Sequence, residues 1–227
     1  MRVRTAEQRP IHSAPNSRKN GRCAATASLT LAAALLQSPA AIAGTGTENW
    51  PERYRVDASH TFPSFEIDHL GFSRHRGRFN RTEGTIDLDR PAGRGRIDLR
   101  IETGSISTGD TKLEDILRSE AFFHTRAFPE ARFRSQSLQF VDQKLTAVDG
   151  ELTLLGVTRS IRLGVDHFHC GLVILGMRYV CGANATGTLS RSAFGMDKYV
   201  NFGLGDEVRL TIQIEAIREA STTSVTP

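Results

Sequence analysis

The sequence is poor in tryptophan, tyrosine and cysteine: its 227 residues contain one Trp, three Tyr and three Cys. It also lacks the short motifs of several enzyme classes, with no HExxH zinc motif, GxSxG nucleophile turn, P-loop or GxGxxG. No repeat, low-complexity tract or internal linker divides the chain. These absences leave no visible catalytic machinery in a chain long enough for one sizeable domain.

The chain as a whole has a net charge of +4, which by itself would suggest a polyanionic partner. Six basic groups and one acidic group lie in residues 1–43, and 23 basic and 24 acidic groups follow them. The excess positive charge therefore belongs to the N-terminal segment, and the remainder is close to neutral. We expect no nucleic-acid partner.

The N-terminal segment has the pattern of a secretory signal. A basic stretch ends at Arg22, the apolar run "AATASLTLAAALL" follows from Ala24 to Leu36, and small residues end at Ala43. The run is short for a membrane span, which needs about 20 apolar residues. We predict a signal peptide over 1–43, a short leader over 44–52, and a periplasmic or secreted protein.

Two cysteines remain after the signal, and they bracket an apolar stretch in "HFHCGLVILGMRYVCG" (167–182). A metal site, a redox switch or a staple across a hairpin are the three alternatives. On a strand, His167 and His169 share one face and Cys170 points to the other, which disfavours a metal. An even cysteine count in an exported protein favours a Cys170–Cys181 disulfide, and we expect no metal site.

Apolar and polar residues alternate along most of the remaining chain. Such alternation predicts strands with one buried and one wet face. The predicted inward sets are Ile86 and Leu88; Ile97, Leu99 and Ile101; Ile161, Leu163 and Val165; and Val208, Leu210, Ile212 and Ile214. Turn signals lie at 89–95, 142–144, 148–150 and 203–207.

One segment has helical spacing instead: Asp110 is an N-cap candidate before apolar Leu113, Ile116 and Leu117. Seven or eight antiparallel strands with one short helix predict an all-β domain, either a sandwich or a closed barrel. The twelve Phe all follow residue 43. They suit an apolar ligand and a plain core equally well.

Two groups of charged residues are candidates for chemistry, each with a simpler interpretation. "RGRFNR" (76–81) is a basic cluster that could hold a phosphate, although Arg76, Arg78 and Asn80 also alternate like the wet face of a strand. Asp87 and Asp89 are spaced like paired carboxylates, but their place on a solvent face predicts that they are solvated rather than catalytic.

Four motifs in order resemble the YceI-like family of polyisoprenoid-binding periplasmic proteins. They are "YRVDASHTFPSFEIDHLGFSRHRGRFNRTEGTIDLD" (54–89), "EAFFHTRAFPEARFRS" (120–135), "DGELTLLGVTRSIRL" (149–163) and "SRSAFGMDKYVNFGLGDEVRLTIQIEA" (190–216). The resemblance places a YceI-like domain at 53–217, with a flexible tail over 218–227.

The resemblance implies an eight-stranded antiparallel lipocalin-like β-barrel with a hydrophobic tunnel. Its ligand would be an isoprenoid lipid, such as a polyprenyl phosphate or a quinone tail, with no other cofactor. Matching positions place the ligand-binding residues at Phe65, His69, Phe72, Phe79, Phe122, Phe123, Phe128 and Phe133. A homodimer and transient contact with a membrane or membrane proteins are further expectations.

The favoured function is therefore non-catalytic carriage or sequestration of an isoprenoid. A lipid-modifying or hydrolytic enzyme acting around His69 and Arg76 is one alternative. A stress-induced protein that acts through surface contacts is the other. In a barrel, Cys170 and Cys181 would clamp the two arms of one extended hairpin.

Overall fold

The computed structural model describes residues 50–220. The predicted signal peptide lies outside these residues, as do most of the predicted leader and tail. Every strand pairing in the sheet is antiparallel. The strands are β1 (Glu52–Val56), β2 (Phe62–His69), β3 (Ser73–Phe79), β4 (Thr82–Asp89), β5 (Arg94–Glu102), β6 (Ile106–Ser107), β7 (Glu130–Val141), β8 (Lys144–Leu154), β9 (Val157–Val173), β10 (Arg178–Ser190) and β11 (Leu204–Arg218).

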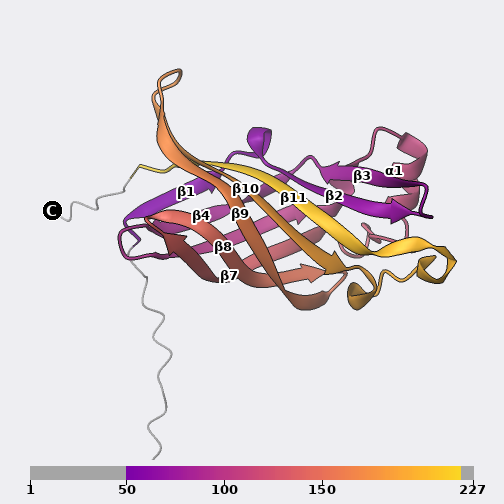
Figure 1. The fold of residues 1–227 in the computed structure, drawn as a ribbon. Coiled ribbons are helices and arrows are strands. Elements are labelled where there is room, and N and C mark those ends of the chain that lie inside the picture. The colour runs from indigo at the N-terminus through magenta and orange to yellow at the C-terminus, as the bar shows by residue number, and fades with distance from the viewer. Residues whose placement is uncertain (1–49, 221–227) are drawn as a thin grey trace, which may run out of the picture. The chain divides into compact units, whose positions relative to one another are not determined.

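The sheet closes on itself into a barrel (Figure 1). The ring runs β1-β4-β5-β7-β8-β9-β10-β11 and returns to β1, which pairs with β11 through Tyr54↔Arg218 and Val56↔Ala216. This closed, eight-stranded antiparallel barrel confirms the predicted fold class.

Three further strands extend the barrel wall at one end. β2 pairs with β11 beyond β1, β3 pairs with β2, and the short β6 pairs with β3. Between β1 and β2, the 3₁₀ helix η1 (Ala58–His60) turns the chain. The buried Thr61 hydroxyl then bonds to both the backbone N–H and the carbonyl of Glu215 at 3.2 Å, which fixes β2 against β11.

A single α-helix lies among the described residues, at the end of the barrel where β2 and β3 turn (Figure 1). α1 (Thr111–Arg118) begins as predicted at Asp110, whose carboxylate accepts from the backbone N–H groups of Lys112 and Leu113. No helix within residues 50–220 is long and apolar enough to cross a membrane. The remaining helical turns are 3₁₀: η2 (Thr103–Ser105), η3 (Ser192–Phe194) and η4 (Val200–Phe202).

Two of the predicted turns are wrong, because 148–150 lies within β8 and most of 203–207 lies within β11. Gly150 is present for close packing rather than for a turn. A Cβ there would lie 2.6 Å from the Phe133 ring and 2.5 Å from the Arg134 carbonyl oxygen. A glycine in a strand can thus mark a site where a large side chain crosses the backbone.

Asp87 corrects a further expectation. It points to the outer face of β4 as predicted, but its side chain is only 1% exposed. The guanidinium groups of Arg53 and Arg96 lie 2.7 and 3.0 Å from its carboxylate. Long arginine side chains on the neighbouring strands shield it from water, so it is an ion-pair partner within the outer surface.

Candidate functional site

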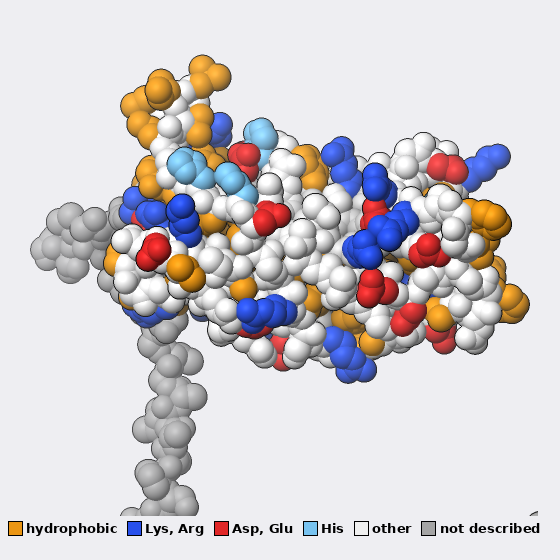
Figure 2. All heavy atoms as spheres, in the orientation of Figure 1, with side chains coloured by type: hydrophobic (Ala, Val, Ile, Leu, Met, Phe, Trp, Pro, Cys, Tyr) orange, Lys and Arg blue, Asp and Glu red, His pale blue; other side chains and the backbone are white. Residues whose placement is uncertain are grey.

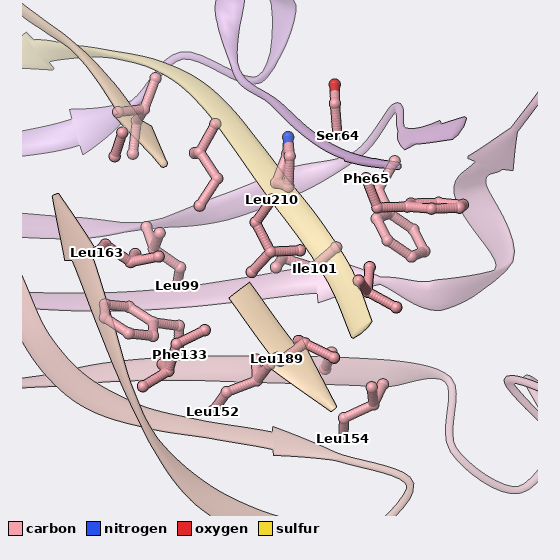
Figure 3. A pocket seen from close by; sticks show the side chains of 18 of the residues that line it. Ser64, Phe65, Leu99, Ile101, Phe133, Leu152, Leu154, Leu163, Leu189 and Leu210 are labelled. Carbon is pink, nitrogen blue, oxygen red and sulfur yellow. The ribbon is translucent and has the colours of Figure 1, made fainter. Parts of the chain in front are cut away.

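The barrel encloses a cavity of about 400 Å³ with an almost entirely hydrophobic lining (Figure 3). Leu99, Ile101, Phe133, Leu163 and Leu210 point into it from four strands. A cavity of this size lies within the range of roughly 300–1,000 Å³ found for small-molecule sites.

The alternation in the sequence explains why this lining is apolar. All of the residues predicted to face inward line the cavity: Ile86, Leu88, Ile97, Leu99, Ile101, Ile161, Leu163, Val165, Val208, Leu210, Ile212 and Ile214. Their polar neighbours along each strand face outward, because successive side chains of a strand point to opposite faces.

A cluster of phenylalanines lines the cavity near α1. Phe79 meets Phe123 edge to face at a ring-centroid distance of 5.4 Å, and Phe65 lies 6.0 Å from Phe79. Gly77 makes room for this cluster, since a Cβ there would lie 2.5 Å from the Phe65 ring. The apolar face of α1 (Leu113, Ile116 and Leu117) completes the wall.

Six of the eight predicted ligand-binding residues line this cavity: Phe65, His69, Phe79, Phe122, Phe123 and Phe133. The other two lie elsewhere. Phe72 is 88% exposed in the β2–β3 turn. Phe128 packs edge to face against His124, and its ring lies 3.1 Å from where a Cβ on Gly156 would be.

Several polar side chains of the lining lie in the β2–β3 hairpin. The rings of His69 and His75 stack at 4.0 Å with an interplanar angle of 7°. Arg76 also contributes to the lining, and its guanidinium donates to Glu66 at 2.7 Å. His75 is not among the residues predicted from the sequence, although it lies in the same hairpin as His69.

The cavity opens at this same end of the barrel. Ile116 on α1 and Tyr199 before η4 both line the cavity, yet they are 53% and 51% exposed. A side chain that contacts both the lumen and water marks the rim of an opening. We call this opening, between α1, the β2–β3 turn and η4, the mouth.

A buried arginine that no sequence motif indicates braces the wall behind the mouth. Arg191 is 2% exposed, and its guanidinium donates to the backbone carbonyls of Met196, Gly205 and Leu204 at 2.7, 2.7 and 3.2 Å. Burial lowers the pKa of Arg191 below its usual value. These three bonds join η3 to the start of β11, where Leu204 pairs with His69.

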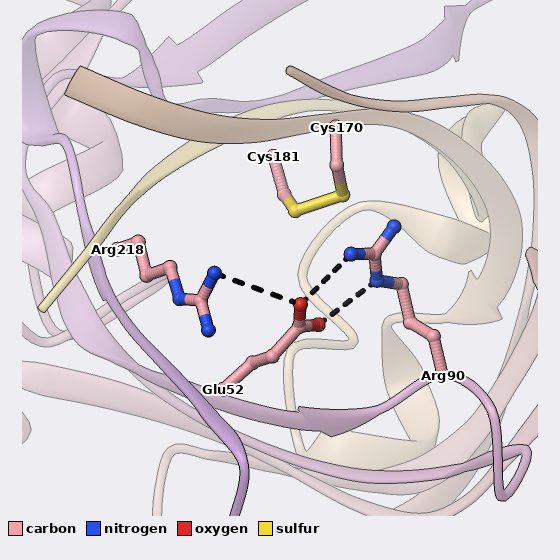
Figure 4. The surroundings of a disulfide bond; sticks show 5 residues. All are labelled: Glu52, Arg90, Cys170, Cys181 and Arg218. Carbon is pink, nitrogen blue, oxygen red and sulfur yellow. Dashed lines mark hydrogen bonds and ion pairs between the residues drawn. A yellow bond between two sulfur atoms is a disulfide. The ribbon is translucent and has the colours of Figure 1, made fainter. Parts of the chain in front are cut away.

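The opposite end of the barrel is closed. The lining residues Tyr54, Cys181 and Ala216 are buried there, and burial raises the pKa of Tyr54 to about 12. Glu52 accepts two bonds from Arg90 at 2.9 and 2.8 Å, with Arg218 at 4.0 Å (Figure 4). The Arg90 guanidinium holds the pKa of Glu52 below its usual range.

The predicted disulfide joins Cys170 and Cys181 beside this ion-pair cluster (Figure 4). The two cysteines are directly opposite in the β9–β10 register, which confirms the clamp across one hairpin. His167 and His169 are exposed on the outer face of β9, whereas Phe168 and Cys170 pack against the core. The histidines and Cys170 therefore do not converge on one point.

The fold and cavity define a lipocalin-like antiparallel barrel with an apolar interior that opens at one end. The YceI-like domain matches residues 54–216, so the chain belongs to the YceI-like family. A UPF0312 protein of Photorhabdus laumondii is 31% identical over 195 residues, covering 84% of this chain and 95% of that protein. Protein YceI of Salmonella arizonae is 28% identical, with the same two coverages.

Solved structures share the fold at lower sequence identity. BcnA of Burkholderia cenocepacia aligns with a TM-score of 0.57 and 19% identity, covering 70% of this chain and 98% of that one. A polyisoprenoid binding domain of Saccharophagus degradans aligns with a TM-score of 0.55 and 17% identity, covering 73% of this chain and 98% of that one. At these identities the likeness concerns the fold alone.

Proposed function

We propose that this protein binds a long-chain isoprenoid lipid in its barrel and carries or sequesters it in the periplasm without altering it. The observation that carries the proposal is the apolar cavity that reaches from the mouth to the closed end. Each Å² of hydrocarbon removed from water contributes about 25 cal/mol, so a long flexible chain gains most by filling such a tunnel.

The mouth suits the polar head of such a lipid. His69 and His75 provide hydrogen-bonding groups beside a wall that is otherwise mostly apolar. Arg76, on the outer face of the same hairpin, adds positive charge at the rim. A phosphate or a quinone carbonyl at this position would accept from the histidine rings, with the chain directed inward. The name of the Saccharophagus neighbour, a polyisoprenoid binding domain, favours the same class of ligand.

The periplasmic location rests on two features. Residues 1–43 have the charge and apolar pattern of an export signal. The Cys170–Cys181 disulfide suits an oxidising compartment.

Organic extraction of the purified protein, followed by mass spectrometry of the lipids, tests the proposal directly. We expect an isoprenoid near one per barrel, with the intact complex visible by native mass spectrometry. Ala183→Trp, which places a large ring in the lumen from β10, should reduce this occupancy. The matched control is Asn184→Trp, because Asn184 is the next residue on the same strand and is exposed.

The predicted site residues allow a second comparison. Phe133→Asp places an unpaired charge in the lining and should abolish occupancy, whereas Phe72→Asp on the exposed turn should not. Equal occupancy in folded Ala183→Trp and wild-type protein would contradict the proposal. Turnover of a polyprenyl diphosphate that is lost in His69→Ala would favour the enzyme alternative.

A further inference from the structure

The β9–β10 hairpin extends beyond the barrel and ends in an apolar tip. We define the hairpin tip as residues 171–179. Its large hydrophobic side chains are exposed, most of all Ile174 (82%), Leu175 (89%) and Met177 (73%), with Leu172 and Val173 beside them. Figure 1 shows the hairpin projecting at the end of the barrel away from α1, and Figure 2 shows its hydrophobic side chains uncovered.

Folding does not account for these side chains. The turn closes with a bond from the Met177 N–H to the Ile174 carbonyl, and both Gly176 and Met177 have positive φ angles, 94° and 49°. Gly, Asn and Asp are the residues that suit such a turn, and none of them would expose a large hydrophobic side chain to water. Exposed Ile, Leu and Met here gain nothing from burial within the chain, which points to a partner.

The disulfide keeps the projecting ribbon ordered. Two strands alone are marginally stable in water. The Cys170–Cys181 bond lies where the ribbon leaves the barrel, and β9 and β10 stay paired beyond it through Leu172↔Tyr179 and Val173↔Arg178. The tip is thus held away from the barrel surface and does not fold back to bury its side chains.

Charge identifies the kind of partner. No acidic residue occurs between Asp166 and Asp197, whereas Arg178 is exposed at the base of the tip. The Arg218 guanidinium lies 5.7 Å from the centre of the Tyr179 ring, and exposed His167 and His169 follow on β9. An apolar end with aromatic and basic residues just behind it matches the layers of a bilayer with an anionic surface.

We infer that the hairpin tip inserts into the surface of an anionic lipid bilayer and tethers the barrel by its closed end. The mouth then faces away from that bilayer and stays free. A second copy of the chain is a poorer occupant, because a standard protein interface buries about 800 Å² on each partner and a two-stranded tip is narrow. This tethering goes beyond the proposed function and does not depend on the lipid in the cavity.

Sedimentation with vesicles tests the inference. The protein is produced from the full chain, and the intact mass of each variant is measured to verify that all share one N-terminus. Vesicles of phosphatidylcholine with phosphatidylglycerol are compared with vesicles of phosphatidylcholine alone. Ile174→Ser with Leu175→Ser should weaken binding to the anionic vesicles by about tenfold or more. Arg178→Gln should weaken it by about fivefold, and added salt should remove that difference.

The matched control replaces two equally exposed hydrophobic residues at the mouth, Phe72→Ser with Phe202→Ser, which are 88% and 78% exposed in wild-type protein. This variant should bind vesicles like the wild-type protein. Binding that is lost in the mouth variant and kept in the tip variant would overturn the inference. So would a wild-type dimer in solution that the tip substitutions convert to a monomer, because the tip would then be an interface between copies.

Failure of this inference can be told from failure of the proposed function. Ala183→Trp changes the cavity and leaves the tip intact, so its vesicle binding should equal that of the wild type. The tip variant should retain the isoprenoid occupancy of the wild type when lipid is supplied in micelles. If the tip variant lost isoprenoid occupancy with lipid supplied in micelles, the tip would also act in lipid binding, and the inference that tethering is independent of the cavity would be overturned.

Discussion

The two ends of this barrel are stabilised by different kinds of contact. At the mouth, short elements surround the opening, half-exposed apolar side chains line its rim, and the stacked rings of His69 and His75 lie beside it. At the closed end, the Glu52–Arg90 pair and the disulfide lie over buried Tyr54. The two ends therefore differ: the mouth is an opening, and the opposite end is closed by ion pairs and a disulfide.

The largest effect should follow from removing the internal brace of the mouth. Arg191→Met leaves three carbonyls, those of Met196, Leu204 and Gly205, without their donor, and we expect the free energy of unfolding in urea to fall by about 3 kcal/mol. The control Arg209→Met, on the exposed face of β11, should stay within about 0.5 kcal/mol of wild type. Equal stability of the two variants would show that the mouth does not depend on this brace.

A smaller effect should follow at the closed end. Glu52→Gln removes the carboxylate that Arg90 binds, and we expect a loss of about 1.5–3 kcal/mol in the free energy of unfolding at neutral pH. The Ile97–Leu99–Ile101 wall is unchanged, so isoprenoid occupancy should persist. A variant that folds normally yet releases its lipid would remove the functional distinction between the two ends.

The same pair should give the closed end a pH dependence. Arg90 lowers the pKa of Glu52 in the folded protein, so the carboxylate stabilises the fold above its unfolded pKa of about 4.3. This stabilisation is lost as the pH falls through the lower, folded value. Denaturant titrations should therefore show a steeper loss of stability below about pH 4 in wild type than in Glu52→Gln.

The smallest effect should come from the helix at the mouth. Asp110→Ala removes the N-cap of α1 and should cost about 1 kcal/mol of helix stability. Because α1 forms part of the rim, lipid should exchange faster even where overall stability changes little. Asp115→Ala, on the exposed face of the same helix, is the control. A slower exchange in Asp110→Ala would argue that lipid does not pass α1.

The sequence predicted the regular parts of the molecule better than the mouth. Alternation located the inward residues of the long strands, because a strand repeats every two residues and the barrel buries one face throughout. The N-cap of α1 and the hairpin disulfide were confirmed for similar reasons, since each depends on local spacing. Whether the selected phenylalanines contact a ligand stays a prediction.

The remaining features depend on contacts between distant segments. Pairing between distant segments brings His75 and Arg191 to the mouth, and no local pattern reveals it. Gly150 has the residue type of a turn, but its role is to leave room for the Phe133 ring. Phe72 and Phe128 had the right residue type in the right motif, but both lie away from the lumen. Composition cannot distinguish a phenylalanine that lines the lumen from one that lies in a turn or outside the barrel, because the residue type is the same.

The closure of the ring by β1 against β11 has a consequence for how the molecule is made. The first and last strands of the described chain must meet before the barrel is closed, and this pairing spans more than 150 residues of sequence, from Val56 to Ala216. Such non-local pairing is slow, and until it forms β1 and β11 each present an unpaired edge to other chains. A chain that is threaded through a membrane before it folds would reach this stage only after its last strand has crossed.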